Sequence, residues 1–135
     1  MGDSSRQAVT RRHLASAASR AHGYSRAVIV EGGRTIYLCG ETALEDARGN
    51  PLAGDFEAQA REVFRKMGAT LIEAGGGLAN LTTMTVFITD PRHGDAFRRV
   101  RIESFGDNFP ASAMIVVTGF GHPDVLVEVQ GIAVL

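Results

Sequence analysis

The sequence predicts an α+β fold in which two helices cover one face of a mixed sheet, with the elements in the order ββαβαββ. Three observations lead to this fold class. Runs of β-branched and apolar residues, typical of strands, alternate with two segments of helical periodicity. Glycine, proline and aspartate separate these segments. The chain has 135 residues, of which 44% are hydrophobic, and this is enough for one packed core.

The first 23 residues differ in composition from the rest of the chain. They contain several arginines and a single acidic residue, and alanine and serine make up much of the remainder. A transit peptide has a similar composition, but a poorly ordered tail in front of a compact domain is commoner. A short helix over residues 10–21 is the alternative, because its apolar residues would share a face. We therefore predict an N-terminal extension, residues 1–23, followed by a single domain, residues 24–135.

Residues 27–30 and 35–39 are β-branched or apolar runs and predict the first two strands. The residues between them, Glu31-Gly32-Gly33-Arg34, contain two glycines that permit the positive φ angles of a tight turn. The two runs are therefore expected to form one antiparallel hairpin. Residues 41–54 are rich in turn-forming residues and predict a loop, with room for a short strand at residues 51–53.

Asp55 is placed to cap the first helix. The apolar side chains after it recur at helical spacing, while the charged side chains fall largely on other faces. The apolar positions are Phe56, Ala60, Val63, Phe64, Met67 and Leu71. The run Gly75-Gly76-Gly77 is expected to end this helix.

Residues 81–89 predict a further strand, which Asp90-Pro91 ends. The same pair can begin the second helix, with the aspartate as cap and the proline in the first turn. The residues expected to share one face of that helix are Phe97, Val100, Arg101, Ser104 and Phe105. Residues 113–118 and 125–134 predict the last two strands, joined by a turn-rich segment.

The last strand has apolar side chains on both of its faces. These side chains are Leu126, Val127, Val129, Ile132 and Val134. A strand of this kind needs cover on both sides. Two helices can cover only one face of the sheet, so we expect the other face to meet another copy of the chain.

Bulk composition excludes several classes of partner. A net charge of −1 and a pI near 6.4 give no general attraction to nucleic acid or to an anionic membrane. The single cysteine, Cys39, cannot form an internal disulfide, which favours a reducing, cytoplasmic setting. No apolar run approaches the roughly 20 residues that span a bilayer. The four histidines show no metal-ligand spacing, and we expect neither a metal nor a cofactor.

Several short segments, in this order and spacing, resemble the RidA/YjgF family of reactive intermediate deaminases. The resemblance covers about four-fifths of the chain, from Tyr24 to the C-terminus. Its pieces are Tyr24-Ser25-Arg26-Ala27-Val28, Cys39-Gly40-Glu41, Gln59, Thr85-Val86-Phe87-Ile88-Thr89-Asp90, Phe97, Phe109-Pro110-Ala111, Val127-Glu128-Val129 and Ile132-Ala133. The resemblance implies a chorismate-mutase-like homotrimer whose three sheets form a central barrel, with pockets in the clefts between neighbouring subunits.

The resemblance also implies a hydrolytic reaction. In the family, an arginine binds the carboxylate of a 2-imino or 2-enamino acid, and a glutamate of the last strand holds the water that attacks the imine carbon. This division suits the chemistry, because a guanidinium matches a planar carboxylate and a carboxylate can orient water. The glutamate corresponds to Glu128 and a pocket tyrosine corresponds to Tyr24.

Other family positions have changed. The arginine corresponds to Ser112, a neighbouring small or thiol position to Met114, and an asparagine of the second helix to Arg101. Serine alone is a weak carboxylate ligand. We expect another cation to replace the arginine, with Arg26 as the first candidate, because in an extended segment it shares a face with Tyr24, and Arg101 as the second.

Each candidate also has a structural interpretation. Glu128 can form an ion pair or hydrogen bond across a subunit boundary, Tyr24 can simply pack, and Arg26 can be solvated. Cys39 is counted among the pocket residues, although a small buried residue is its commoner role. Two functions therefore stay open: an imine or enamine deaminase of altered substrate range, with low activity on ordinary 2-imino acids, or a protein that binds a small, possibly anionic, metabolite without turnover.

Overall fold

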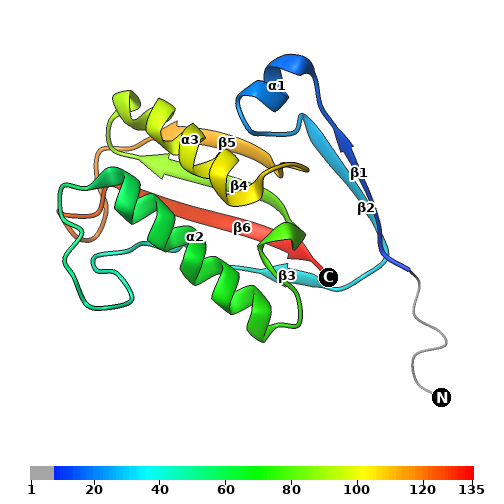
Figure 1. Cartoon of the computed structure of the whole chain (residues 1–135), viewed down its shortest axis with the longest axis horizontal. Coiled ribbons are helices and arrows are strands. Elements are labelled where there is room, and N and C mark those ends of the chain that lie inside the picture. The colour runs from blue at the N-terminus through cyan, green and yellow to red at the C-terminus, as the bar shows by residue number, and fades with distance from the viewer. Residues whose placement is uncertain (1–7) are drawn as a thin grey trace.

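The computed structural model describes residues 8–135 and shows two helices packed on one face of a four-stranded sheet (Figure 1). The strands are β1 (Thr10–Leu14), β2 (Ala27–Glu31), β3 (Thr35–Tyr37), β4 (Leu81–Ile88), β5 (Ala111–Val116) and β6 (Val127–Val134). The helices are α1 (Ala17–Ala21), α2 (Phe56–Glu73) and α3 (Gly94–Phe105), with the short 3₁₀ turns η2 (Leu78–Asn80) and η3 (Pro91–His93). From β2 onward the order is ββαβαββ, as the sequence predicts.

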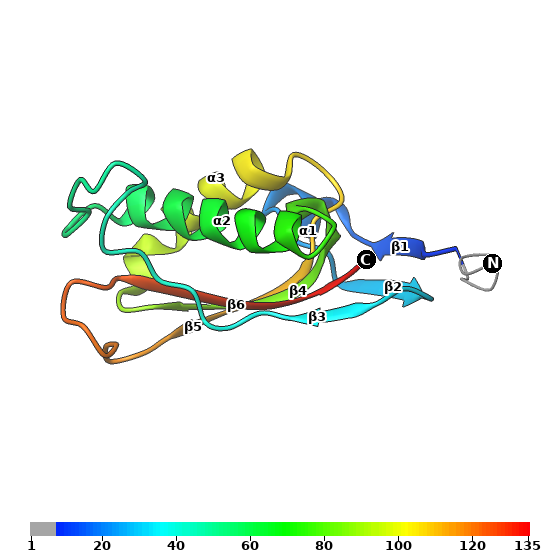
Figure 2. The same cartoon turned by 90° about the horizontal axis from the view of Figure 1, so that it is seen from below.

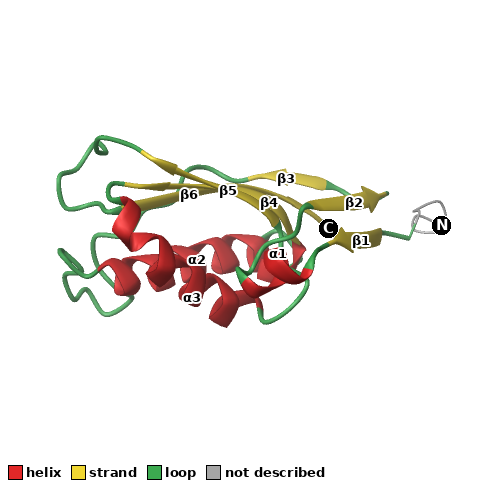
Figure 3. Cartoon of the chain, turned by 90° about the horizontal axis from the view of Figure 1, so that it is seen from above, coloured by secondary structure: helices red, strands yellow, loops and turns green. Residues whose placement is uncertain are grey.

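The main sheet has the strand order β3-β6-β4-β5. β6 is antiparallel to both of its neighbours, while β5 is parallel to β4 because α3 carries the chain across between them. β1 and β2 form a separate antiparallel pair that extends past the end of the main sheet (Figure 2). Both α2 and α3 lie on the same side of the sheet (Figure 3). β5 is therefore an edge strand beside α3.

The predicted hairpin of residues 27–30 and 35–39 does not form. β2 pairs with β1, and β3 pairs with β6. Gly32 and Gly33 do adopt positive φ angles of 77° and 84°. The chain then passes to another partner, because the backbones of Arg34 and Leu135 exchange hydrogen bonds of 2.7 and 2.8 Å. The segment 51–53 makes only an isolated bridge between Glu45 and Pro51 and is not a strand.

The predicted helix over residues 10–21 is only half right. Its first half is the strand β1, which pairs with β2 along its whole length, and its second half is the short helix α1. Ser16 begins α1 by accepting a hydrogen bond from the Ser19 backbone, and the Ser19 side chain bonds back to the Ser16 N–H. Residues 8–23 are thus joined to β2 instead of forming a loose tail. The division at residues 23 and 24 stays a prediction, and residues 1–7 lie outside the described part.

The helix α2 begins where the sequence predicts, whereas α3 begins a few residues later than predicted, after a short 3₁₀ turn. Asp55 caps α2 by accepting a hydrogen bond from the Ala58 N–H, and Ala74 followed by Gly75 at a φ of 102° ends it. Asp90 caps η3, and α3 follows directly after this turn. The apolar face predicted for α2 is buried in full. In the face predicted for α3, Ser104 and Phe105 are only partly buried.

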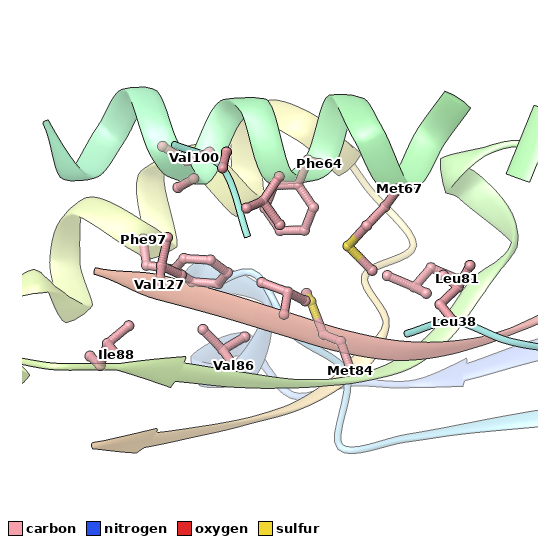
Figure 4. Packing of buried hydrophobic residues seen from close by; sticks show 14 of the residues in the cluster. Leu38, Phe64, Met67, Leu81, Met84, Val86, Ile88, Phe97, Val100 and Val127 are labelled. Carbon is pink, nitrogen blue, oxygen red and sulfur yellow. The ribbon is translucent and has the colours of Figure 1, made fainter. Parts of the chain in front are cut away.

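The core lies between the helices and the sheet (Figure 4). Phe64 of α2 packs against Phe97 of α3 and Phe105, with ring centroids 5.6 and 5.4 Å apart. Below them, β4 and β6 contribute alternate residues, among them Val86 and Val127, which are fully buried. No helix within residues 8–135 is long and apolar enough to span a membrane.

The other face of the sheet is not covered by any helix of residues 8–135 (Figures 2 and 3). The strand pairing aligns side chains of neighbouring strands in rows across this face. Residues on it are Tyr37, Thr83, Thr85, Phe87, Ala113, Ile115, Glu128, Gln130 and Ile132. Tyr37 is 78% exposed and Ile115 is 44% exposed. We call this set the open sheet face. Glu128 is the only residue of the set with a carboxylate or a basic side chain.

Candidate functional site

Three of the predicted site residues come together at the edge of the sheet. Arg101 of α3 donates from Nη1 to the Ser112 hydroxyl of β5 at 3.0 Å. Its Nη2 donates to the carbonyl of His22 at 2.7 Å. The guanidinium carbon lies 5.9 Å from the ring centroid of Tyr24 and 5.6 Å from that of Phe97. Arg101, Ser112 and Tyr24 are therefore one cluster, which we call the edge cluster.

Arg101 is only 3% exposed, and within residues 8–135 no carboxylate forms an ion pair with it. Its Nε atom is buried and has no hydrogen-bond partner among those residues. Burial, with a smaller contribution from the nearby charge of Arg98, lowers the pKa of Arg101 to about 10, and Tyr24 opposes both effects. The side chain stays protonated at neutral pH, so the edge cluster contains a buried positive charge.

The segment before β2 holds Tyr24 against the edge of the sheet. The Ser25 hydroxyl donates to the carbonyl of Phe109 at 2.5 Å, and the Ser25 N–H donates to the carbonyl of Pro110 at 3.0 Å. Gly23 turns the chain here with a φ of 77°, and an added Cβ would lie 2.6 Å from a side-chain carbon of Ile102. The backbone at Gly23 can therefore pass close over α3, which brings the next residue, Tyr24, to Arg101.

Glu128 lies elsewhere. It pairs with Phe87 on the open sheet face, between the fully buried Val127 and Val129, which point to the helices. Its carboxylate lies against Gly40, where an added Cβ would be 2.5 Å from Oε2. Glu128 is only partly buried, because nothing in residues 8–135 covers this face. Within those residues the carboxylate has no hydrogen-bond or ion-pair partner.

The Glu128 side chain and the edge cluster lie on opposite faces of the sheet. Ser112 is the register partner of Met84, which is 2% exposed and faces the helices. Glu128 is the register partner of Phe87, three residues further along β4. Because side chains alternate along a strand, an odd separation places these two groups on opposite sides. One chain alone therefore does not bring the edge cluster and Glu128 into one pocket.

The remaining predicted residues, Arg26, Met114 and Cys39, form no side-chain hydrogen bond with either group within residues 8–135. Arg26 is exposed, and its backbone N–H donates to the Leu14 carbonyl at 2.7 Å. Met114 packs against the core, close to Gly94 at the start of α3. Cys39 was expected to be buried, but it is exposed: regular strand pairing ends at Tyr37, although Leu38 and Glu41 on either side of Cys39 still hydrogen-bond to β6.

Several hollows lie outside these groups, and two of them bear on the sequence predictions. One, of about 260 Å³, is on the open sheet face and is lined by residues that include Tyr37, Thr85 and Gln130. The other, of about 300 Å³, lies beside β1 and is lined by Arg11, Arg12, His13, Arg20 and Asp107, among others. Sequence reasoning missed the second hollow, although the excess of arginines before residue 23 was its signal. No group of acidic, histidine or cysteine side chains in residues 8–135 is arranged to hold a metal.

Comparison with known proteins places the chain in a family. A family model described as Endoribonuclease L-PSP matches residues 14–135. The chain belongs to the RidA/YjgF family. Among solved structures, a Rid-family protein from Yersinia pestis superposes with a TM-score of 0.80 at 24% identity, covering 93% of this chain and 98% of that one, and this likeness shows the fold. A protein of unknown function from Pseudomonas aeruginosa superposes with a TM-score of 0.68 at 33% identity, covering 95% and 94%.

Some RidA/YjgF relatives have an assigned activity. The 2-iminobutanoate/2-iminopropanoate deaminase of Capra hircus is 32% identical over 111 residues, covering 82% of this chain and 79% of the relative. The human protein of the same name is 28% identical over the same length and coverage. A RutC family protein from Pyrococcus abyssi is 31% identical over 110 residues, covering 82% of this chain and 84% of the relative.

Proposed function

We propose that this RidA-family protein is a hydrolase that deaminates an imine or enamine, in a cleft between subunits of a homotrimer, with a substrate range different from that of the named deaminases. The observation that supports this most is the Glu128 carboxylate, which is unpaired within residues 8–135 and lies at the uncovered face of the sheet. The similarity to deaminases from Capra hircus and Homo sapiens supports the reaction class.

The proposed reaction needs one water molecule and one carboxylate. Glu128 accepts a proton as water adds to the imine carbon, which forms a C–O bond. The same proton is returned to the nitrogen, which gives a carbinolamine. Glu128 then carries the hydroxyl proton to the amine, the C–N bond breaks as the C=O bond forms, and the products are ammonia and a keto acid. A carboxylate without an internal partner suits this role, because a salt bridge to a neighbouring residue would compete with the water.

A cleft between subunits follows from the separation of Glu128 and the edge cluster. A ligand held near Ser112 can meet a Glu128 only if that glutamate belongs to another copy of the chain. The open sheet face supports such an assembly, since it exposes Tyr37 and Ile115 among hydroxyl and apolar neighbours. In this arrangement the open sheet faces of three copies would meet, as the resemblance implies for a central barrel.

The altered substrate range is proposed from Ser112. Its hydroxyl is bound to Arg101 and cannot itself supply a positive charge to a carboxylate. Ordinary 2-imino acids are therefore expected to be poor substrates. The alternative function, binding of a small metabolite without turnover, rests on the same substitution. A cytoplasmic location remains part of the proposal, on the ground of the single unpaired cysteine.

The test is an imine-trapping assay. An amino-acid oxidase generates imino acids in place, and semicarbazide reports how fast they disappear with and without the protein. We expect acceleration for part of a broad amino-acid panel and a fall of about 100-fold or more in Glu128→Gln, which keeps the shape but removes the base. Glu73→Gln, an exposed change at the end of α2, is the matched control and should leave the rate unchanged.

Two results would contradict the proposal, the first its reaction and the second its mechanism. If no imine in the panel disappears faster with the wild-type protein, the binding function is favoured. If Glu128→Gln is as active as the wild type, the water is not held by Glu128 and the proposed mechanism is wrong.

A further inference from the structure

The hollow of about 300 Å³ beside β1 has an excess of positive charge that the proposed reaction does not use. Arg11 and Arg12 of β1 and Arg20 of α1 line it, and within residues 8–135 none of the three forms an ion pair. Asp107 is the one acidic residue of its lining, and its carboxylate accepts a hydrogen bond from the Asn108 N–H at 2.9 Å. We call this space the arginine hollow. Its charge favours an anionic ligand.

Arg11 is held in the arginine hollow by the last strand of the sheet. Its Nη2 donates to the carbonyl of Val134, the last residue of β6. Its Nε is buried and has no hydrogen-bond partner within residues 8–135. A guanidinium has five N–H donors, and a buried donor without an acceptor is costly. The Arg11 side chain is therefore oriented before any ligand binds, and it still has donors to offer to an anion.

His13 and Asn108 add further donors beside Arg11. Because alternate residues of a strand point to the same side, Arg11 and His13 share one face of β1, and both are partly buried. Arg12 projects from the other face, so its charge is expected to contribute less. Asn108, in the connection from α3 to β5, lines the same hollow with them. Imidazole, amide and guanidinium groups can all donate to an anion that has several acceptor oxygens.

A larger hollow, of about 450 Å³, adjoins the arginine hollow. The two share four lining residues, which are Arg11, His13, Asp107 and Asn108. The other residues that line the larger hollow are uncharged, and one of them is Phe105, which is partly buried and packs its ring edge against Phe64. A ligand can therefore place an anionic group among the arginines and an apolar or aromatic group beside Phe105.

The arginine hollow is separate from the groups of the proposed reaction. No residue of the edge cluster lines either hollow. Arg11 binds Val134, whereas Glu128 lies six residues earlier in β6, which is roughly 20 Å along an extended strand. Figures 1 and 2 show β1 near the C-terminal end of β6. A ligand in the arginine hollow would thus leave the Glu128 carboxylate of the same chain untouched.

We propose that the arginine hollow binds the phosphate group of a small phosphate monoester, whose organic part occupies the adjoining hollow. A phosphate has several acceptor oxygens and pairs with guanidinium groups in bidentate geometry. It has close to two negative charges at neutral pH, which suits several arginines around one carboxylate. The two hollows have the size of a small-molecule site. A chain with a net charge of −1 lacks the extended basic surface that nucleic acid requires.

Calorimetry on the full-length protein tests the ligand class. Phenyl phosphate is compared with phenyl sulfate, which has nearly the same shape but only one negative charge. We expect phenyl phosphate to bind at least about tenfold more tightly, because the second charge strengthens the attraction to the guanidinium groups. Equal affinity of the two probes, or no binding of phenyl phosphate at millimolar concentration, would overturn the site. Inorganic phosphate binding as tightly as phenyl phosphate would overturn the role of the adjoining hollow.

Variants locate the charge that the ligand meets. Arg20→Met and Arg11→Met should each weaken phenyl phosphate binding by about fivefold or more, since a charge-assisted hydrogen bond is lost. Arg48→Met is the matched control, because Arg48 is an exposed arginine of the loop 41–54 and its loss changes the net charge equally. If Arg11→Met does not fold, Arg20→Met and the control still decide. Equal losses in Arg20→Met and Arg48→Met would show attraction to the overall charge and no site.

Amide chemical shifts show where the probe binds. In nuclear magnetic resonance spectra of the isotope-labelled protein, phenyl phosphate should shift the amide signals of His13, Phe105 and Asn108 and leave that of Glu128 in place. Shifts confined to Ser112 and Glu128 would place the phosphate in the proposed reaction cleft and overturn the separate site.

Two further titrations distinguish this proposal from its rivals. A short single-stranded oligouridine that binds more tightly than phenyl phosphate, and loses affinity in Arg20→Met, would assign the arginine hollow to nucleic acid and overturn the small ligand. Glu128→Gln should bind phenyl phosphate as the wild type does. Phosphate binding by a protein without imine hydrolysis therefore leaves this site standing and removes the deaminase, whereas imine hydrolysis without phosphate binding does the reverse.

Discussion

Gln59 joins three parts of the chain through one buried amide. Its Nε2 donates to the carbonyls of Leu52 and Asp124 at 3.0 and 2.9 Å, and its Oε1 accepts from the Leu126 N–H at 2.9 Å. Gln59→Leu removes all three bonds and leaves backbone groups without partners. We expect the free energy of unfolding to fall by about 2 to 3 kcal/mol.

Urea unfolding measures this loss as a lower midpoint. Glu73→Gln, exposed on the same helix, is the control and should shift the free energy by less than about 0.5 kcal/mol. A Gln59→Leu protein as stable as the wild type would show that these bonds add nothing net to the fold. The sequence singled out Gln59 only as part of the family resemblance, because two of its three backbone partners, those of Asp124 and Leu126, lie 65 and 67 residues away along the chain.

At the scale of elements, the start of α2 depends on the Asp55 side chain. Its Oδ1 accepts from the Ala58 N–H at 3.1 Å, which satisfies one of the donors that every helix start leaves free. Asp55→Ala should lower the free energy of unfolding by about 1 kcal/mol, whereas Asp55→Asn, which can still cap, should lose much less. Thermal or urea unfolding of the pair checks this. Equal losses in both variants would mean that the charge near the helix end matters and the cap does not.

The elements that the sequence predicted well are those fixed by local rules. Caps, helical periodicity and the glycine stop of α2 depend on residues a few positions apart, and the structure confirms them. The predicted hairpin failed because strand partners are set by distant contacts. Two glycines make a turn possible, but Arg34 pairs with Leu135 at the other end of the chain, and no local pattern contains that information.

In the candidate site, too, the features that depend on local patterns were predicted, and those that depend on distant contacts were not. The helical period predicted that Arg101 shares a face with Phe97, and the structure confirms it. The hydrogen bond from Arg101 to Ser112 depends on how α3 crosses β5, so periodicity alone could not choose between Arg101 and Arg26. The exposure of Cys39 was missed for a related reason: the strand ends two residues earlier than its apolar run suggested.

At the scale of the whole molecule, the proposed assembly can be tested by an experiment that needs no measurement of ligand affinity. If the site takes Glu128 from one subunit and the edge cluster from another, a protein lacking one group can complement a protein lacking the other. Glu128→Gln and Arg101→Met are each expected to be strongly impaired alone. After the two are unfolded together in equal amounts and refolded, about a quarter of the subunit interfaces should combine an intact Glu128 with an intact Arg101.

The mixture should therefore regain about a quarter of the wild-type rate in the imine assay, while each variant refolded by itself stays inactive. Native mass spectrometry supplies the control, since distinct tags reveal mixed trimers of about 43 kDa, three times the 14.4 kDa chain. Mixed trimers without recovered activity would place both groups in one chain's own pocket, against the opposite faces of Ser112 and Glu128. A stable single chain at micromolar concentration would remove the shared cleft altogether, because the open sheet face would then have no partner to supply the second half of the site.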